Sequence, residues 1–487
     1  MRILARTFVS CVFAGSFVSA ASPSDDARHV IALAELQRSV DPRVVALLDG
    51  EPQTAARAAL ALGRSKKPEA RGILRQRLGA ANVTLRTFAA YGEGLLADPA
   101  ALPVEVRLAR HDPSSAVRYA AVDAVDRIVG ADATLGTPAI SAALLDAVAH
   151  DPDATVRGHA ALALVALRGR PGSTQRASRL ADAFARERSA DVRWHEMWAL
   201  FRGYAFVAPR AALVRGLRDS SDVVRIEAVR ALGKRGGAGT LQVLQPMVGD
   251  RSWRVQEQAR EALFQIAKKP FTDHLKLLPM GLHLPAPDAP NTEPTYAPQT
   301  GLTPATSTKP QAPTADELLP AIPLVAPNAA TLDGPLPGKH PRVRIHTTKG
   351  DLVVRLFPEW APYTVANFLN LTARGYYDNN RWFRIVPDFV VQTGDPNDNG
   401  EGDAGYTIPA EENPVEQRSA IISMGMNYEN NHPIRDSAGT QFYLTISPQP
   451  HLDRDFTVFG ELESGMATIA RLVESDRMIK VERLQDR

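Results

Sequence analysis

The sequence predicts a multidomain protein, in which an all-α helical-repeat solenoid is followed by a mainly β domain that closes into an antiparallel barrel with capping helices. The chain of 487 residues is too long for one hydrophobic core. A helical pattern recurs over residues 26–270, and apolar residues alternate with polar ones at the start of residues 340–483. A proline-rich stretch, residues 271–339, separates the two patterns.

The overall composition is that of a globular protein, with 44% hydrophobic and 23% charged residues. The formal net charge of +2 is small for this length, and lysine and arginine form no dense block. Neither nucleic acid nor an anionic membrane is therefore expected as the main partner.

Residues 1–20 have the features of a secretory signal peptide. Arg2 and Arg6 give a positive start, an apolar run follows, and Ser19-Ala20 supplies small residues at a cleavage site. The apolar run is shorter than the roughly 18 residues that span a bilayer. We expect an exported protein located in the periplasm, with the extracellular medium as the alternative.

The single cysteine, Cys11, lies inside this segment. A lipid anchor on Cys11 is the less favoured interpretation, because Phe8 stands where a lipobox has leucine and the apolar run continues beyond the cysteine. A chain cleaved after Ala20 has no thiol, which suits an oxidising compartment.

Residues 26–270 repeat one pattern, in which an acidic residue and a short turn precede an arginine and then small or aliphatic residues at helical spacing. The clearest copies are Asp112 with Arg118, Asp151 with Arg157, Glu187 with Arg193, and Asp219 with Arg225. We count about seven units at intervals of roughly 30 to 40 residues, the range of helical solenoids. Each helix pair must stack on its neighbours to bury its apolar face. The array resembles short bacterial HEAT repeats.

The repeated arginines have two interpretations. Stacked along one face, they would bind phosphate groups, or they would pair with the acidic residues and join adjacent repeats. The second is favoured, because an acidic residue precedes each arginine at a similar offset. Three aromatic residues are expected in the helical core and not in a cofactor site: Trp194, Trp198 and Phe201.

Proline recurs every few residues between positions 271 and 339, together with alanine, threonine and asparagine. Such a segment favours polyproline II geometry, so we expect a semi-rigid tether of up to about 3 Å per residue. A second interpretation is that the apolar residues at Leu318-Leu319 and Ile322-Pro323-Leu324 dock on one of the domains.

Residues 340–483 begin with period-two alternation, as in Leu352, Val354 and Leu356, which predicts a hairpin with its turn at Lys349-Gly350-Asp351. A helix is expected from Ala361, ending before Gly375, followed by short strands with glycine-rich and asparagine-rich turns. A closed antiparallel barrel with a helix at each end accommodates this order.

Several short motifs lie in this second part. They are Arg381 to Pro396, Ser423-Met424-Gly425, Gly439 to Tyr443, Leu452-Asp453 and Phe456 to Gly460. In order and spacing they resemble the cyclophilin family of peptidyl-prolyl cis-trans isomerases, over about Val343 to Val481. The resemblance implies rotamase activity, a role in protein folding and no cofactor.

Catalysis of X-Pro rotation must lower a barrier of about 18 to 20 kcal/mol that arises from amide resonance. No covalent step is needed, only tighter binding of the twisted peptide than of either planar isomer. The fixed donor fork of an arginine suits this task better than the point charge of a lysine. By resemblance, Arg384 is the catalytic arginine and Gln392 holds its guanidinium.

The resemblance also implies the substrate-binding residues. The proline pocket is assigned to Phe389, Val390, Tyr443, Leu452 and Phe456. The peptide groove is assigned to Gly425, Met426, Gln441 and His451. His451 stands where some members carry tryptophan, a difference that usually accompanies weak cyclosporin binding.

Some positions depart from the common family pattern: Phe383 for histidine, Val390 for methionine, Tyr443 for phenylalanine and Met426 for asparagine. None of these changes removes the arginine or the pocket. The segment Tyr428–Ala438 is longer than in compact members, which affects the edge of the groove.

A purely structural interpretation remains for single residues: Arg384 would pair with Asp388 or Glu411, and Phe389 and Leu452 would be ordinary core. The joint match of the motifs favours the functional interpretation. His432 and His451 lack a metal-ligand pattern, so no metal is expected.

We therefore expect an exported isomerase that acts on proline-containing polypeptide clients, with a solenoid that binds a client or a partner protein. One alternative is a scaffold whose barrel grips proline-containing peptides with little turnover. The other alternative is a solenoid that regulates the barrel by covering its groove.

Overall fold

The computed structural model describes residues 25–237, 239–267, 340–430, 432–453 and 455–485. The predicted signal peptide with Cys11 and the proline-rich tether lie outside the described residues. Within those ranges, no helix is both long enough and apolar enough to cross a membrane.

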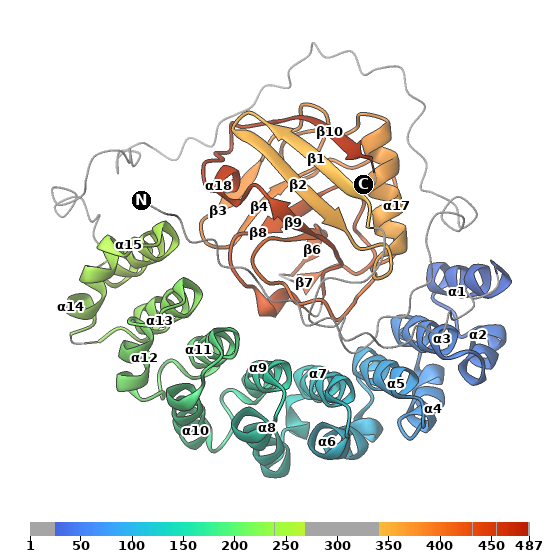
Figure 1. Ribbon diagram of the computed structural model, residues 1–487, viewed down its shortest axis with the longest axis horizontal. Coiled ribbons are helices and arrows are strands. Elements are labelled where there is room, and N and C mark those ends of the chain that lie inside the picture. The colour runs from blue at the N-terminus through green and yellow to red at the C-terminus, as the bar shows by residue number, and fades with distance from the viewer. Residues whose placement is uncertain (1–24, 238, 268–339, 431, 454, 486–487) are drawn as a thin grey trace, which may run out of the picture.

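The N-terminal part is an arc of stacked helix pairs (Figure 1). Its helices are α1 Asp25–Gln37, α2 Pro42–Ala46, α3 Pro52–Arg64, α4 Pro68–Arg77, α5 Val83–Leu96, α6 Leu102–His111, α7 Ser115–Ala131, α8 Pro138–His150, α9 Ala154–Ala163, α10 Ser173–Arg186, α11 Ala190–Tyr204, α12 Arg210–Gly216, α13 Asp222–Arg235, α14 Thr240–Leu244 and α15 Trp253–Ala267. From α3 onward, odd-numbered helices line the inner side of the arc and even-numbered helices the outer side. The predicted solenoid is confirmed.

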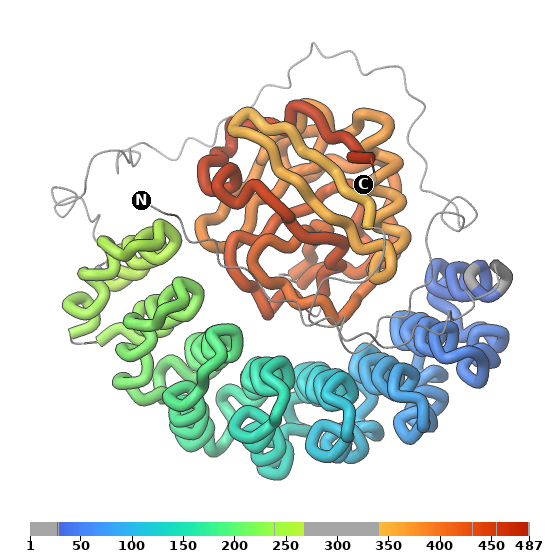
Figure 2. The backbone as a smooth tube through the Cα atoms, in the orientation of Figure 1, coloured from blue at the N-terminus to red at the C-terminus, as the bar shows by residue number. Residues whose placement is uncertain are grey.

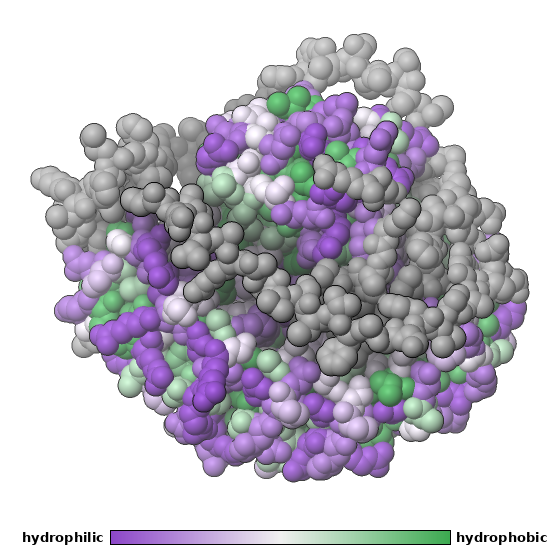
Figure 3. Space-filling view, viewed as in Figure 1, coloured by the Kyte–Doolittle hydropathy of each residue, from purple (hydrophilic) through white to green (hydrophobic). Residues whose placement is uncertain are grey.

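Small residues let the inner helices approach closely. A Cβ atom on Gly63 of α3 would lie 2.7 Å from the Cα of Gly92 in α5, a distance that no side chain tolerates. The predicted core residues on these helices are buried, Trp194 and Trp198 included, while Phe201 is half-buried. Hydrophilic side chains cover much of the outer helices (Figure 3), as expected for the solvent side of a solenoid.

The repeated arginines form ion pairs between adjacent repeats. In each, the arginine Nε lies 2.7 or 2.8 Å from a carboxylate oxygen: Arg86 with Asp112, Arg118 with Asp151, Arg157 with Glu187, Arg193 with Asp219 and Arg225 with Asp250. Each acid thus belongs to the repeat that follows the arginine. Since the donors also bind backbone carbonyls, as Arg118 Nη1 does at Asp112 O at 2.9 Å, the phosphate-binding interpretation is wrong.

The C-terminal part is one eight-stranded antiparallel sheet in the order β10-β1-β2-β9-β5-β8-β4-β3, with a separate β6-β7 hairpin. The strands are β1 Arg342–Thr347, β2 Gly350–Leu356, β3 Arg384–Val386, β4 Val390–Thr393, β5 Ile421–Met424, β6 Tyr428–Glu429, β7 His432–Pro433, β8 Phe442–Thr445, β9 Val458–Ser464 and β10 Met478–Leu484. The helices α17 Pro362–Ala373 and α18 Met466–Ile469 flank it (Figure 1).

The sheet curls so far that its two edges meet. A single bridge pairs Arg381, just before β3, with Arg477, just before β10. The predicted barrel is therefore confirmed, with one bridge rather than a full ladder at its seam. The predicted turn at Lys349-Gly350-Asp351 is wrong in register, because Gly350 and Asp351 already pair with Thr347 and His346 of β1.

The barrel sits inside the arc of the solenoid (Figure 2). Phe357, Trp360, Ile421 and Val458 of the barrel belong to the same buried apolar cluster as the solenoid core. The ring of Trp360 lies 6.1 Å from that of Phe88 in α5. The two parts therefore share a continuous hydrophobic interface.

One fully buried arginine ties the two parts through backbone carbonyls. Arg64, at the end of α3, donates from Nη2 to Trp360 O at 2.7 Å and from Nε to Glu412 O at 3.0 Å. Its Nη1 lies 2.9 Å from Glu35 Oε1 of α1. All three guanidinium nitrogens thus have an acceptor, and two of these acceptors lie across the interface.

A second buried ionic group surrounds Glu416 of the barrel. Its carboxylate accepts from Tyr119 Oη at 3.0 Å and lies 3.3 Å from His195 Nε2 and 3.4 Å from His159 Nδ1. Burial alone lowers the pKa of His159, but Asp123 and Glu416 outweigh it and raise the pKa to about 10. The interface thus joins the buried Glu416 carboxylate of the barrel to a protonated His159 of the solenoid, which fixes the docking register.

Candidate active site

The β3–β4 hairpin places the predicted catalytic pair side by side. Arg384 and Gln392 face each other in the strand register, and Arg384 Nη1 donates to Gln392 Oε1 at 3.2 Å. Arg384 is exposed at the edge of the barrel. The solenoid therefore does not bury this guanidinium, as a solenoid covering the groove would.

The carboxylates that a structural interpretation assigned to Arg384 are used elsewhere. Asp388 Oδ2 lies 2.6 Å from Arg230 Nη2 of the solenoid. Glu411 accepts from the backbone amides of Tyr363 and Thr364 at the start of α17, at 3.1 and 2.9 Å. In the described part of the chain no carboxylate forms an ion pair with Arg384, and its side chain is exposed to solvent.

A relay of amides orients Gln392. Its Nε2 donates to Gln441 Oε1 at 3.1 Å, and Gln441 Nε2 donates to Gly400 O at 2.9 Å and Gly402 O at 3.1 Å. Because the Gln392 nitrogen is occupied, its oxygen is left for the arginine. Gly425 lies against this relay, where a Cβ atom would come within 3.2 Å of Gln392 Nε2.

The predicted proline-pocket residues form an apolar cluster of their own, separate from the barrel core. Its buried members are Val390, Tyr443, Leu452 and Phe456, and Phe389 and Met426 pack against them. The Tyr443 and Phe456 rings lie 5.7 Å apart and nearly perpendicular. The structure thus brings together five pocket residues that the sequence spreads over almost seventy positions.

Phe389 contacts both Arg384 and His451. The Arg384 guanidinium carbon lies 5.5 Å from the centre of the Phe389 ring, and the ring of His451 stacks on Phe389 at 5.8 Å. Loss of hydration, with the charges of Arg202 and Arg230 acting in the same direction, lowers the pKa of His451 to about 4. His451 keeps an exposed edge and is neutral at pH 7.

Sequence reasoning missed one aromatic residue at this site. Tyr428 of β6 is 57% exposed, and its ring lies 6.3 Å from that of Phe456. It belongs to the long segment Tyr428–Ala438, for which the family resemblance assigned no role. The available signal in the sequence was an aromatic residue beside two consecutive asparagines.

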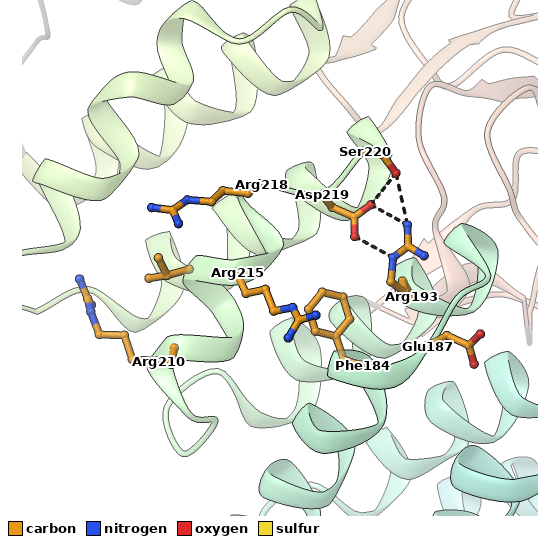
Figure 4. A pocket seen from close by; sticks show the side chains of 10 residues that line it. Phe184, Glu187, Arg193, Arg210, Arg215, Arg218, Asp219 and Ser220 are labelled. Atoms are coloured by element: carbon orange, nitrogen blue, oxygen red, sulfur yellow. Dashed lines mark hydrogen bonds and ion pairs between the residues drawn. The ribbon is translucent and has the colours of Figure 1, made fainter.

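A separate hollow of about 790 Å³ lies on the solenoid, between α10 and α12 (Figure 4). Its walls include Arg193, Arg210, Arg215 and Arg218, but Arg193 is held by Asp219. The hollow belongs to outer helices, so it is not part of the site around Arg384.

Comparison with known proteins identifies the families of both parts of the chain. The family model for cyclophilin type peptidyl-prolyl cis-trans isomerases matches residues 342–485, and that for HEAT repeats matches residues 40–126 and 202–276. A peptidyl-prolyl cis-trans isomerase-like 1 of Aspergillus niger is 40% identical over 135 residues, which are 27% of this chain and 80% of that protein. The chain belongs to the cyclophilin-type isomerases.

Two further relatives match the cyclophilin domain. Peptidyl-prolyl cis-trans isomerase B of Bacillus subtilis is 40% identical over 128 residues, covering 26% of this chain and 85% of that protein. A cyclophilin type isomerase structure from Cryptosporidium parvum has 29% identity and a TM-score of 0.29, covering 30% of this chain and 99% of that chain. The family models and the sequence relatives, and not this structural match, show a peptidyl-prolyl cis-trans isomerase with an N-terminal HEAT-repeat solenoid.

Proposed function

We propose that this protein is an exported folding catalyst, in which Arg384 drives X-Pro isomerisation and the solenoid binds client chain next to the proline. The observation that carries the proposal is the guanidinium of Arg384, which has no carboxylate partner among the described residues and is held by Gln392 beside a separate apolar cluster. An assay of X-Pro isomerisation by the full-length protein tests it. A rate no greater than the uncatalysed one would favour the scaffold alternative.

The chemistry follows from the positions of these groups. The pocket around Tyr443, Leu452 and Phe456 anchors the proline ring, so that the peptide on the other side of the bond rotates. As the amide twists, its nitrogen gains a lone pair that accepts a hydrogen bond from Arg384. This donor is already in place, so little reorganisation is needed at the moment of rotation.

Client binding by the solenoid is supported by a surface formed by Phe201 and Arg202 of α11, Phe206 of the loop that follows α11, and Lys234 of α13. This surface lies near the site, because the charge of Arg202 contributes to the lowered pKa of His451. The Arg202 guanidinium lies 5.9 Å from the Phe201 ring, and Lys234 Nζ lies 5.9 Å from the ring of Phe206, which is 66% exposed. Among the described residues, neither cation has an ion-pair partner. Such a surface favours client segments with acidic or aromatic residues.

Reversing the charge of Arg202 is expected to alter substrate preference. The Arg202→Glu variant should raise KM about fivefold for a peptide with an acidic residue beside its proline, the magnitude of one exposed charge contact. A neutral peptide should show little change. Arg107→Glu, at an exposed position of the outer helix α6, is the matched control. Equal effects on both peptides would contradict this client surface.

Export is tested by the N-terminus of the mature protein. Expressed in a bacterium with its natural leader, the protein should be recovered outside the cytoplasm and begin at Ala21, because signal peptidase cuts after small residues such as Ser19-Ala20. Recovery of an intact Met1 in the cytoplasmic fraction would contradict export. A lipid-modified Cys11 at the mature N-terminus would instead support the anchored alternative.

A further inference from the structure

The turn of the catalytic hairpin has an unusual backbone conformation. Between β3 and β4, Asp388 has φ +53° and is only 2% exposed. A left-handed conformation costs energy for any residue with a side chain, so the surroundings must hold it. The position of this turn sets the position of Arg384, four residues before it, and of Phe389, directly after it.

The barrel holds the turn only in part. Gln449 Nε2 donates to Asp388 O at 3.1 Å, and Ser447 Oγ donates to the same oxygen. Ile446 N donates to Phe389 O at 2.8 Å. These bonds fix the backbone carbonyls, but among the described barrel residues no cation pairs with the buried Asp388 carboxylate.

The solenoid supplies the missing partner. Arg230 Nη2 of α13 donates to Asp388 O at 2.7 Å and lies 2.6 Å from Asp388 Oδ2. A second solenoid cation, Arg254 of α15, lies 3.9 Å from the other carboxylate oxygen. One guanidinium nitrogen thus contacts both the backbone and the side chain of the strained residue.

Arg230 is itself fixed by other residues of the solenoid. Its Nη1 donates to Glu227 Oε1 at 2.9 Å and its Nε to Gln258 Oε1 at 3.0 Å. Glu227 is fully buried. Because three directions of the planar fork are used, Arg230 reaches the barrel in one defined orientation.

We propose that Arg230 is a positioning residue for isomerisation, and that the solenoid, through Arg230, holds the β3–β4 hairpin in its catalytic geometry. The proposal rests on the proposed role of Arg384. The Arg384 guanidinium lies over the Phe389 ring, so a shift of the Asp388 turn moves the guanidinium relative to the proline pocket. The solenoid is then a structural part of the enzyme as well as a client-binding surface.

The test compares full-length variants by isomerisation kinetics. Arg230→Met is expected to lower kcat about tenfold, because small misplacements of a catalytic group cost up to about a hundredfold in rate. KM should change by less, since the proline pocket keeps its own contacts. Arg107→Met, an exposed arginine of the outer helix α6, should leave both constants unchanged. An unchanged kcat in Arg230→Met would overturn the proposal.

A milder variant covers the case in which Arg230→Met fails to fold. Arg230→Lys keeps a cation beside Glu227 and Asp388 but cannot contact Glu227, Gln258 and Asp388 together. Its thermal midpoint should stay close to that of the wild type while kcat falls about threefold, a smaller misplacement than in Arg230→Met. A wild-type kcat in this variant would equally overturn the proposal.

Amide hydrogen exchange separates this inference from the proposed role of Arg384. In either Arg230 variant, the amides of Phe389 and Val390 should exchange faster than in the wild type, whether or not the protein catalyses isomerisation. Unchanged exchange would overturn the positioning role even in an active enzyme. Faster exchange in a protein whose isomerisation rate does not depend on Arg384 would support the role of Arg230 in holding the hairpin. The same result would reject the catalytic role of Arg384.

Discussion

Replacing Arg64 by methionine is expected to weaken the docking of the solenoid on the cyclophilin domain by about 3 to 5 kcal/mol, the usual cost of removing one partner from a buried ionic network. The side chain of Arg64 is fully buried. Its loss leaves the carbonyl oxygens of Trp360 and Glu412 without this donor, and Glu35 loses one of its two close ion pairs and keeps that with Arg57. Methionine fills the space but offers no donor.

Hydrogen exchange at the interface measures this effect. The buried amide of Glu411 should exchange on the order of 10² to 10⁴ times faster in Arg64→Met, because each 1.36 kcal/mol of opening free energy is about a factor of ten. The matched control is Arg107→Met, for which a change within about 0.5 kcal/mol is expected. If both variants exchanged at the same rate, the ionic contacts of Arg64 would contribute nothing to docking.

The solenoid was predictable because its signals are local. The recurrence of an acidic residue and an arginine indicates both the period of the repeat and its ion pairs. Pairing with the next repeat, as in Arg118 with Asp151, depends on how neighbouring units stack, which spacing alone does not determine. The register of the β1–β2 hairpin was missed because Gly350, with φ +127°, already belongs to the strand.

The docking of the two parts was not predictable from the sequence. Arg64 and Glu412 are 348 positions apart, and nothing in the local pattern around either residue indicates the other. A buried arginine in a helix and a glutamate in a long loop both have the appearance of ordinary surface charges in a sequence. Only the folded structure shows that Arg64 and Glu412 lie in a buried interface.

The residues of the candidate site were predictable from the sequence, but the tertiary contacts that hold them in place were not. Arg384, Gln392 and the pocket residues were found together because the family motifs keep their order. The support of Asp388 by Arg230 was missed, since the two residues lie 158 positions apart in different domains. The residues assigned by the family motifs can be recognised in the sequence, whereas a contact between distant residues such as Arg230 and Asp388 leaves no local pattern.

Replacing Arg384 by alanine is expected to lower kcat/KM for X-Pro isomerisation by on the order of 10² to 10³, the usual effect of removing one preorganised donor from a transition state. The loss should fall mainly on kcat, because the proline ring still enters the pocket of Val390, Tyr443 and Phe456. Stability should change little, since Arg384 is exposed and makes one side-chain hydrogen bond, to Gln392. Isomerisation of a tetrapeptide measures the rate, and thermal unfolding measures the stability.

Arg384→Lys distinguishes the donor geometry from the charge. Lysine keeps the positive charge but lacks the planar fork, so it should recover no more than about a tenth of the wild-type kcat/KM. Full recovery in the lysine variant would mean that a point charge at the rim of the pocket is sufficient. In Arg384→Ala, a kcat/KM within about twofold of the wild type would mean that the apolar side chains alone lower the barrier. That result would contradict catalysis by a hydrogen-bond donor at the twisted amide nitrogen.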